Sequence, residues 1–484
     1  MNAEKEIKKD SLHENLDIEI KNNEKHIEII SPIGGSILGT VPAYSKEEVD
    51  REIKKAKNAF PAWRDTPLSV RAEVLYKASD ILLRNIDELT DLLVHEVGKD
   101  KKSANSEISR TADFMRFTAD TAKSIHGESI QGDNFSGFNK EKVAVVTREP
   151  VGVVLAISPF NYPINLAASK IAPALAAGNT VVFKPATTGA LCGTKLVEIF
   201  KEAGLPDGVL TMVTGKGSEI GDYVVTHQDI NFINFTGSTE VGEHISKMTT
   251  MVPLLMELGG KDAAIVLKDA DLSFAAKNIV SGAFSYSGQR CTAVKRILVL
   301  NEVADELIAK LKELIEQLKI GNPLEEQVDV VPLINERAAD FVWNLIEDAK
   351  EKGAKLICGG KRESNLIFPT LLDYVTTDMR VAWEEPFGPV LPVLRVESVD
   401  EAIRLANASE YGLQSSVFTE NIEDAFYVAS KLEVGTVQIN NKTERGPDHF
   451  PFLGVKKSGI GTQGIRYSIE AMTRVKATVI NLHY

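Results

Sequence analysis

The sequence is poor in cysteine. Its 484 residues contain only Cys192, Cys291 and Cys358, which lie far apart along the chain. Three scattered cysteines provide neither a disulfide framework nor the closely spaced ligands of a zinc site. We therefore expect no bound metal, and the low cysteine content favours a reducing, cytoplasmic compartment.

Long apolar runs and an excess of positive charge are also missing. No apolar stretch reaches the ~18–20 residues that cross a membrane, and the first 25 residues lack the apolar core of a secretory signal. The formal net charge is −13, which argues against nucleic acid or an anionic membrane as a partner. Any anionic ligand would need a local basic pocket.

The chain is long for a single hydrophobic core, so we expect two or three domains. Residues 1–24 read as a polar tail of mixed charge. Ser45 followed by Glu48 gives the capping-box pattern that starts a helix. A second long amphipathic helix is expected over residues 69–97, ending near Gly98.

The pattern changes near residue 150. Short apolar runs rich in β-branched residues, such as 180–184 and 230–235, alternate with helical segments. Such runs are typical of a parallel sheet covered by helices on both faces, with ligands bound beyond the carboxyl ends of the strands. The pattern restarts after Gly259–Gly260, where we expect the boundary to a second α/β domain.

The sequence has no glycine-rich dinucleotide fingerprint after its first strand and no Walker motif. The nearest equivalent is FTGSTEVG, where Gly237 and Ser238 follow a strand; a glycine there lets a phosphate approach the backbone. In FKPATT, Lys184 could contact ribose hydroxyls or a phosphate, or simply extend from a strand end. Thr187, rather than an acidic residue, leaves room for the extra phosphate of NADP.

Cys291 lies in SGQRCTAVKR, beside Arg290 and shortly before Lys295 and Arg296. Neighbouring cations favour the thiolate, the form of cysteine that attacks carbon. The alternative is that Cys291 is a small buried apolar residue without a chemical role.

Three further segments favour the chemical interpretation. Asn161, between a strand end and a helix, could donate to a developing oxyanion together with the backbone N–H of Cys291. Glu257 precedes two glycines and is a candidate general base. Glu385 and Phe387, in a loop constrained by proline and glycine, could hold a sugar and a ring.

Taken in order, the motifs FNYP, KPAT, FTGST, ELGGK, GQRC and EEPFGP resemble the aldehyde dehydrogenase superfamily from about residue 25 to the end. The resemblance implies a Rossmann-like cofactor domain, an α/β catalytic domain and a small β extension for oligomerisation. It also implies that Cys291 is the nucleophile, Asn161 the oxyanion donor and Glu257 the base that hydrolyses the thioester.

Within the superfamily, four segments are most similar to the non-phosphorylating members that oxidise glyceraldehyde 3-phosphate with NADP: SEISRTADF, FNYP, GQRCTAVKR and NNKTERGPDHFPFLG. This likeness implies that Arg110, Tyr162, Arg290 and Arg445 converge on the substrate phosphate, whose oxygens suit guanidinium forks. His449, in the last segment, is interpreted as structural.

Other functions stay open at this point. A semialdehyde dehydrogenase could bind a carboxylate-bearing aldehyde with one or two of these arginines. A cysteine hydrolase could use Cys291 and Asn161 but would not need the KPAT and FTGST segments. A non-catalytic binding protein would have no reason to keep Cys291, Asn161 and Glu257 together.

The resemblance also predicts oligomeric assembly, as a homotetramer, through strands near 141–150 and 471–482, because exposed strands invite pairing. The expected division is a polar tail (1–24), an NADP-binding domain (25–138 and 152–259), a catalytic domain (260–435), oligomerisation strands (139–151 and 465–484) and a substrate-site loop with a return segment (436–464).

Overall fold

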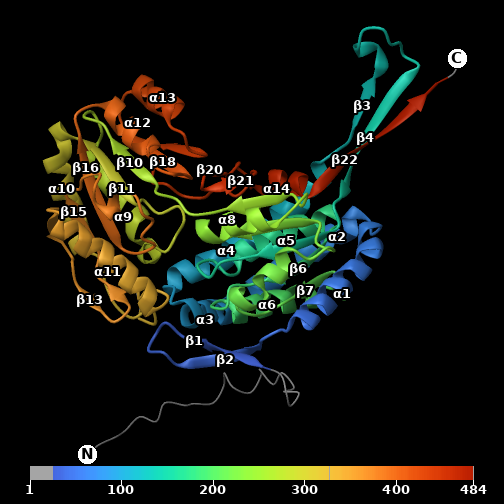
Figure 1. Cartoon of the computed structure of the whole chain (residues 1–484), viewed down its shortest axis with the longest axis horizontal. Coiled ribbons are helices and arrows are strands. Elements are labelled where there is room, and N and C mark those ends of the chain that lie inside the picture. Colours follow the sequence, from blue (N-terminus) through green and yellow to red (C-terminus); the bar gives the residue numbers. More distant parts are fainter. Residues whose placement is uncertain (1–24, 326, 483–484) are drawn as a thin grey trace, which may run out of the picture.

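The computed structural model describes residues 25–325 and 327–482, so the predicted tail over 1–24 lies outside the described residues. The described chain forms two α/β lobes and a projecting arm of strands (Figure 1). The two largely parallel sheets agree with the α/β fold class that the sequence predicts.

Helices dominate the start of the first lobe. The predicted capping box at Ser45 is present and opens α1 (Lys46–Arg64). The prediction of one helix over residues 69–97 is wrong, because Asn85 leaves the helical conformation and separates α2 (Leu68–Arg84) from α3 (Ile86–Val97). The break lets each helix turn its own apolar face toward the core that they share with α4 (Lys101–Ser124).

The sheet of the first lobe has the order β21-β9-β8-β5-β6-β7. Its parallel strands are β5 (Val153–Ile157), β6 (Thr180–Lys184), β7 (Leu210–Met212), β8 (Phe232–Thr236) and β9 (Leu254–Glu257). The chain runs outward from β5 through β6 to β7 and then returns to β8 on the other side of β5. Ligands bind at such a switch point, beyond the carboxyl ends of the strands. The helices that follow the strands include α5 (Asn165–Ala177), α6 (Ala190–Glu202), α7 (Asp222–Val225) and α8 (Thr239–Met248).

The second lobe is built on a sheet of order β12-β15-β16-β11-β10-β18-β19, in which all pairs except β12 with β15 are parallel. Its strands are β10 (Ala263–Val266), β11 (Arg296–Leu300), β12 (Lys355–Cys358), β15 (Thr370–Asp373), β16 (Val390–Val396), β18 (Gln414–Phe418) and β19 (Thr436–Ile439). Its helices include α9 (Leu272–Phe284), α10 (Asn301–Glu316), α11 (Glu336–Glu351), α12 (Val399–Asn407) and α13 (Ile422–Lys431).

The C-terminal part returns across the first lobe. β21 (Gly459–Ile460) pairs with β9, α14 (Ile465–Ala471) packs against α4 and α5, and β22 (Thr473–Asn481) pairs with β4 (Lys142–Pro150). β3 (Glu128–Gln131) lies on the other edge of β4. We call the sheet β22-β4-β3 and the loop between β3 and β4 the arm.

Three domain boundaries in the structure differ from those predicted from the sequence. β3 belongs to the arm rather than to the lobe predicted over 25–138, residues 465–471 are helical rather than extended, and β19 lies in the second sheet although it begins at residue 436. Strand pairing between distant segments decides the first and the third boundary, and the helix over 465–471 packs against α4 and α5.

Short elements complete the described chain: β1 (His26–Ile30) and β2 (Ile37–Pro42), β13 (Arg362–Glu363) and β14 (Leu366–Ile367), and β17 (Tyr411–Gly412) and β20 (Val455–Lys456). In the part of the chain that the structure describes, no helix is both long and apolar enough to cross a membrane.

Candidate active site

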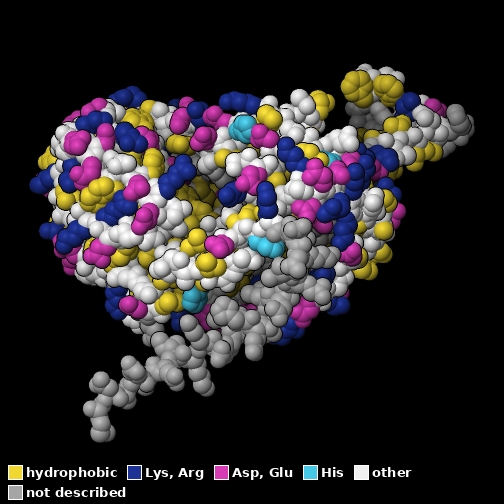
Figure 2. Space-filling view, turned by 60° about the horizontal axis from the view of Figure 1, so that its bottom comes forward, with side chains coloured by type: hydrophobic (Ala, Val, Ile, Leu, Met, Phe, Trp, Pro, Cys, Tyr) yellow, Lys and Arg dark blue, Asp and Glu magenta, His cyan; other side chains and the backbone are white. Residues whose placement is uncertain are grey.

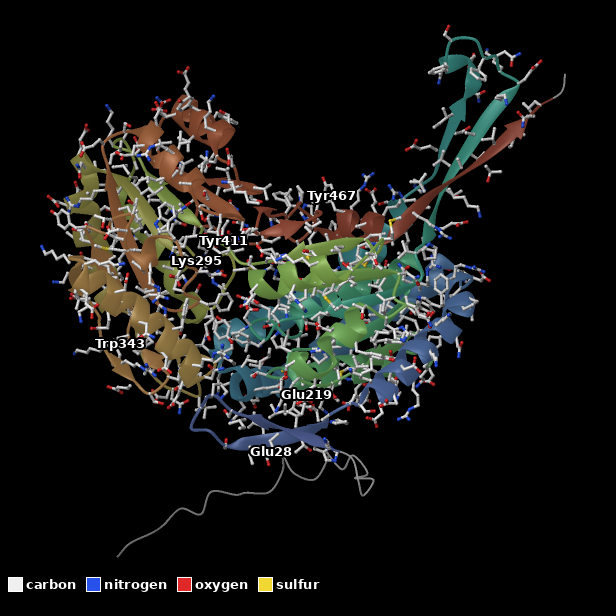
Figure 3. The ribbon with its side chains drawn as sticks, in the orientation of Figure 1. Glu28, Glu219, Lys295, Trp343, Tyr411 and Tyr467 are labelled. Carbon is white, nitrogen blue, oxygen red and sulfur yellow. The ribbon has the colours of Figure 1, made fainter. Side chains whose placement is uncertain are left out.

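The candidate residues lie on two facing edges. Four of them follow parallel strands of the first sheet at their carboxyl ends. Asn161 follows β5, Lys184 ends β6, Ser238 follows β8 and Glu257 ends β9. Cys291 comes just before the amino end of β11 in the second sheet. Lys295, four residues further along, lies at the junction of the two lobes (Figure 3). The site therefore forms where the lobes meet.

Cys291 and Glu257 are in direct contact. The thiol of Cys291 donates to Oε1 of Glu257 at 3.4 Å. Glu257 is only 2% exposed, whereas Cys291 keeps part of its surface open. A partly open thiol beside a buried carboxylate can meet a small substrate and transfer its proton locally.

The flanking cations do not activate this thiol in the free chain. Burial and the negative charge of Glu257 raise the pKa of Cys291 well above its usual value, and Lys295 offsets them only in part. The expectation that Arg290, Lys295 and Arg296 would favour the thiolate is therefore wrong for this state. Sequence proximity suggested it, but the two arginines bind backbone carbonyls elsewhere and Lys295 binds the carbonyl of Cys291 rather than its sulfur.

Each of these cations is held by other groups. Lys295 donates to the carbonyl of Cys291 and lies 3.1 Å from Oε1 of Glu385. Arg296 donates to the carbonyl of Ala406 at 3.0 Å. Arg290, predicted at the substrate phosphate, donates to the carbonyl of Gly282, and no contact with Arg110 or Arg445 is recorded among the described residues.

Asn161 lies next to the cysteine loop. Its side-chain amide donates to the carbonyl of Gln289 at 2.9 Å, while its Oδ1 is buried without a hydrogen-bond partner. An amide nitrogen carries two hydrogens, so one is still available to an oxyanion near Cys291.

The backbone before Cys291 is strained. Tyr286 and Ser287 adopt left-handed conformations, with φ of 50° and 54°. Such conformations in residues other than glycine persist only where the surroundings enforce them. Here the hydroxyl of Tyr286 donates to the carbonyl of Val97, and that of Ser287 to the carbonyl of Val331, both at 2.7 Å. These bonds fix the loop that carries the thiol.

Two of the predicted arginines are joined through an acidic residue that the sequence reasoning missed. Arg110 donates to both carboxylate oxygens of Asp448, at 2.6 and 2.7 Å. The same carboxylate lies 3.7 Å from Nε of Arg445. Arg445 also donates to Oε2 of Glu257 at 2.8 Å. A chain of charged groups thus runs from Arg110 through Asp448 and Arg445 to the carboxylate of Glu257.

Tyr162 is held by a buried ion pair. Lys99 lies 3.7 Å from the centre of the Tyr162 ring and also donates to Glu107 and to the carbonyl of Asn161. Glu107 accepts from the backbone of Ile164 at the start of α5. Because both charged side chains are fully buried, the loop of Asn161 and Tyr162 is rigidly positioned.

A cavity of about 790 Å³ lies beside these groups. Its walls include Arg110, Tyr162, Phe284 and Tyr286, so it reaches one end of the charge chain. The rest of the wall carries both acidic and basic side chains, so Arg110 is the group in it that links the cavity to the charge chain.

Lys170 is a second residue that sequence reasoning missed. It is fully buried on α5 and donates to Oγ1 of Thr236, which lies 3.4 Å from Oε2 of Glu257. Burial lowers the pKa of Lys170 to about 7, although Glu257 opposes the shift. A lone lysine inside an otherwise apolar helical segment was the available signal.

The predicted cofactor residues line the same edge of the first sheet. Burial lowers the pKa of Lys184 at the end of β6, and Thr187 follows in the partly exposed loop. Ser238 caps α8 by accepting from the backbone of Val241. A side chain at Gly237 would lie 2.5 Å from the ring of Phe235, so the turn requires glycine.

Glu385 and Phe387 precede β16 on the facing edge. Glu385 accepts from the backbone of Gly260 at 3.1 Å and pairs with Lys295. The Phe387 ring packs edge-on against Phe160, with centroids 6.0 Å apart. His449, expected to be structural, packs against Phe117 and Phe450, with ring centroids 5.2 and 4.8 Å away.

A model of the aldehyde dehydrogenase family matches residues 20–478. The chain belongs to the aldehyde dehydrogenase family. It is 57% identical over 464 residues to an NADP-dependent glyceraldehyde-3-phosphate dehydrogenase of Streptococcus equinus, covering 96% of this chain and 97% of that one. A protein of the same name from Pisum sativum is 51% identical, over 95% of this chain and 92% of that one.

A crystal structure of an NADP-dependent glyceraldehyde-3-phosphate dehydrogenase from Bacillus halodurans C-125, complexed with NADP, has the same fold. It superposes with a TM-score of 0.94 at 57% identity, covering 95% of this aldehyde dehydrogenase and 96% of that chain. The broad family resemblance noted in the sequence is thereby confirmed.

Proposed function

We propose that this aldehyde dehydrogenase oxidises D-glyceraldehyde 3-phosphate to 3-phosphoglycerate with NADP and without inorganic phosphate. The observation that carries the proposal is the contact chain from Cys291 through Glu257 and Arg445 to Arg110. It joins a nucleophile, a base and cationic groups for a phosphate at one site. The names of the relatives support the same reaction.

Oxidation begins when the sulfur of Cys291 attacks the aldehyde carbon. The thiol proton has an acceptor at hand, because the thiol already donates to Glu257. The carbonyl oxygen becomes an oxyanion, which accepts from the free amide hydrogen of Asn161 and from the backbone N–H of Cys291. Bound NADP supplies the redox chemistry by accepting a hydride.

The resulting thioester is hydrolysed. Glu257 first passes the thiol proton to solvent and then accepts a proton from a water molecule, whose oxygen attacks the acyl carbon. The carbon–sulfur bond breaks, the acid is released, and the sulfur leaves as a thiolate that takes back the proton from Glu257. Arg445 orients Glu257, since it donates to Oε2 while the thiol of Cys291 donates to Oε1. At the far end of the substrate, the phosphate is held by Arg110, Tyr162, Arg290 and Arg445, with Arg290 turning from Gly282 to reach it.

The residues on the first sheet fit NADP. Lys184 provides a buried cation whose pKa is lowered by burial, so a bound anion or ribose hydroxyl would offset its desolvation. Thr187 leaves room for a 2′-phosphate, and the turn of Gly237 and Ser238 admits the pyrophosphate at the start of α8. Glu385 and Phe387 complete the site from the second lobe.

The test is an assay for NADPH formation in phosphate-free buffer. Glyceraldehyde 3-phosphate is expected to be oxidised far more efficiently than succinate semialdehyde, as judged by kcat/KM. Faster oxidation of succinate semialdehyde would instead identify a semialdehyde dehydrogenase, and a requirement for inorganic phosphate would exclude hydrolytic release by Glu257.

The enzyme is further proposed to act in the cytoplasm as a homotetramer. The arm carries exposed hydrophobic side chains, which are visible on its surface (Figure 2); they are Ile130, Phe135, Phe138, Val145, Val475, Val479 and Ile480. An exposed strand edge of this kind is protected by pairing with another subunit. Light scattering on the purified protein measures the assembly.

A further inference from the structure

The carboxylate of Asp448 lies between two of the arginines that are proposed to bind the substrate phosphate. It receives two hydrogen bonds from Arg110, in the paired geometry that guanidinium groups form with carboxylates and phosphates. It also lies near Arg445, and its side chain is only 12% exposed. The sequence analysis assigned no role to this residue.

The charges in this cluster already balance. The guanidinium groups of Arg110 and Arg445 face the carboxylates of Asp448 and Glu257. An incoming anion therefore meets no excess positive charge at these two arginines. The anion can accept hydrogen bonds from these arginines only if it displaces a carboxylate or if both bind the same guanidinium group.

We propose that Asp448 is a specificity-determining residue, because its carboxylate competes with the ligand for Arg110. A phosphate group carries nearly two negative charges and three acceptor oxygens, so it outcompetes the internal carboxylate. Either ligand takes Arg110 from Asp448 and leaves this largely buried carboxylate with only the more distant Arg445. A ligand carboxylate forms no stronger contacts with Arg110 than Asp448 did, so nothing offsets that cost. Asp448 thus selects phosphorylated aldehydes over carboxylate-bearing ones.

Removal of this carboxylate is compatible with folding, because the loop that carries it has other anchors. Thr443 donates to the carbonyl of Thr292 at 2.9 Å, and the backbone of Glu444 donates to Gln414 at 3.0 Å. Ile465 donates to the backbone carbonyl of Asp448 itself. The variant Asp448→Asn keeps the shape of the side chain and removes only its charge.

The experiment measures inorganic phosphate and acetate as competitive inhibitors against glyceraldehyde 3-phosphate. In Asp448→Asn, the inhibition constant of acetate is expected to fall about tenfold, and that of phosphate much less, so that the selectivity for phosphate narrows. The proposal would be overturned if the ratio of the two inhibition constants stayed the same, whether both constants were unchanged or both changed by the same factor.

Two further variants separate selectivity from structure. Asp373→Asn breaks a similar two-bond pair, with Arg395 in the second sheet, and is expected to leave the ratio unchanged. Arg110→Gln combined with Asp448→Asn is expected to match Arg110→Gln alone. If Asp448→Asn still changes the ratio of the acetate and phosphate inhibition constants in the Arg110→Gln variant, the Asp448 carboxylate does not act through Arg110, and the proposal is wrong.

The inference rests on the proposed function, but the two can fail separately. If the unaltered enzyme does not prefer glyceraldehyde 3-phosphate, the proposed function fails. If it does prefer this substrate while Asp448→Asn leaves the inhibitor ratio unchanged, only the role of Asp448 fails.

Discussion

The guanidinium of Arg445 lies 2.8 Å from the carboxylate of Glu257. Glu257 in turn contacts the sulfur of Cys291 through its other oxygen. In the proposed mechanism, Arg445 binds the substrate phosphate and also contacts Glu257, the base for thioester hydrolysis. Substitution of either residue is therefore expected to affect both steps.

Replacement of Cys291 by serine is expected to abolish NADPH formation while leaving NADP binding intact, because the hydroxyl is a far weaker nucleophile. Fluorescence titration with NADPH checks that the cofactor site survives. Residual oxidation near the level of the unaltered enzyme would show that another group attacks the aldehyde.

Glu257→Gln is expected to separate the two half-reactions. The variant should still release a burst of NADPH equal to the concentration of active sites, because hydride transfer precedes hydrolysis. Steady-state turnover should then fall by about 10²–10⁴-fold, the usual contribution of a general base. Stopped-flow absorbance measures both phases, and normal turnover would remove Glu257 from hydrolysis.

The pH dependence of thiol alkylation tests the electrostatics of the pair. Burial and Glu257 raise the pKa of Cys291, so the thiol is protonated at neutral pH and its reaction with iodoacetamide should accelerate as the pH rises above 9. Because Glu257→Gln removes a negative charge, it should lower this pKa and increase alkylation at pH 8. A slower reaction in the variant would contradict the assignment; Cys291→Ser supplies the background rate from Cys192 and Cys358.

Arg445→Ala and Arg110→Gln are expected to differ. Loss of Arg445 leaves Glu257 buried and unpaired, which costs ~2–5 kcal/mol for such a pair, so oxidation of unphosphorylated glyceraldehyde should also decline. Loss of Arg110 should reduce kcat/KM mainly for the phosphorylated substrate. Kinetics on both aldehydes make the comparison, and identical profiles for the two variants would refute it.

Thr187→Glu is expected to reduce kcat/KM with NADP much more than with NAD, because the new carboxylate repels the 2′-phosphate and can accept from the ribose hydroxyl of NAD. Parallel assays with the two cofactors measure the change in preference. An equal loss with both would mean that position 187 does not face the 2′-phosphate.

Much of the local structure was predictable because it depends on neighbouring residues. The capping box at Ser45 and Glu48 and the buried strands over 180–184 and 230–235 appear where the pattern placed them. The break at Asn85 was not predictable, since the apolar spacing continues through it. There, packing of two helices against one core outweighs local periodicity.

The sequence by itself determined which chemical groups the site has and the order in which they occur: an asparagine before a helix, a glutamate before two glycines, a cysteine beside cationic residues and several arginines. Only the tertiary structure decided which charges meet. Arg290, Lys295 and Arg296 neighbour Cys291 in the chain but bind backbone carbonyls, whereas Glu257 contacts its sulfur from the other lobe. The physical reason is that Coulomb energy and desolvation depend on distance and burial in the folded state, and these arise only when the two sheets pack edge to edge.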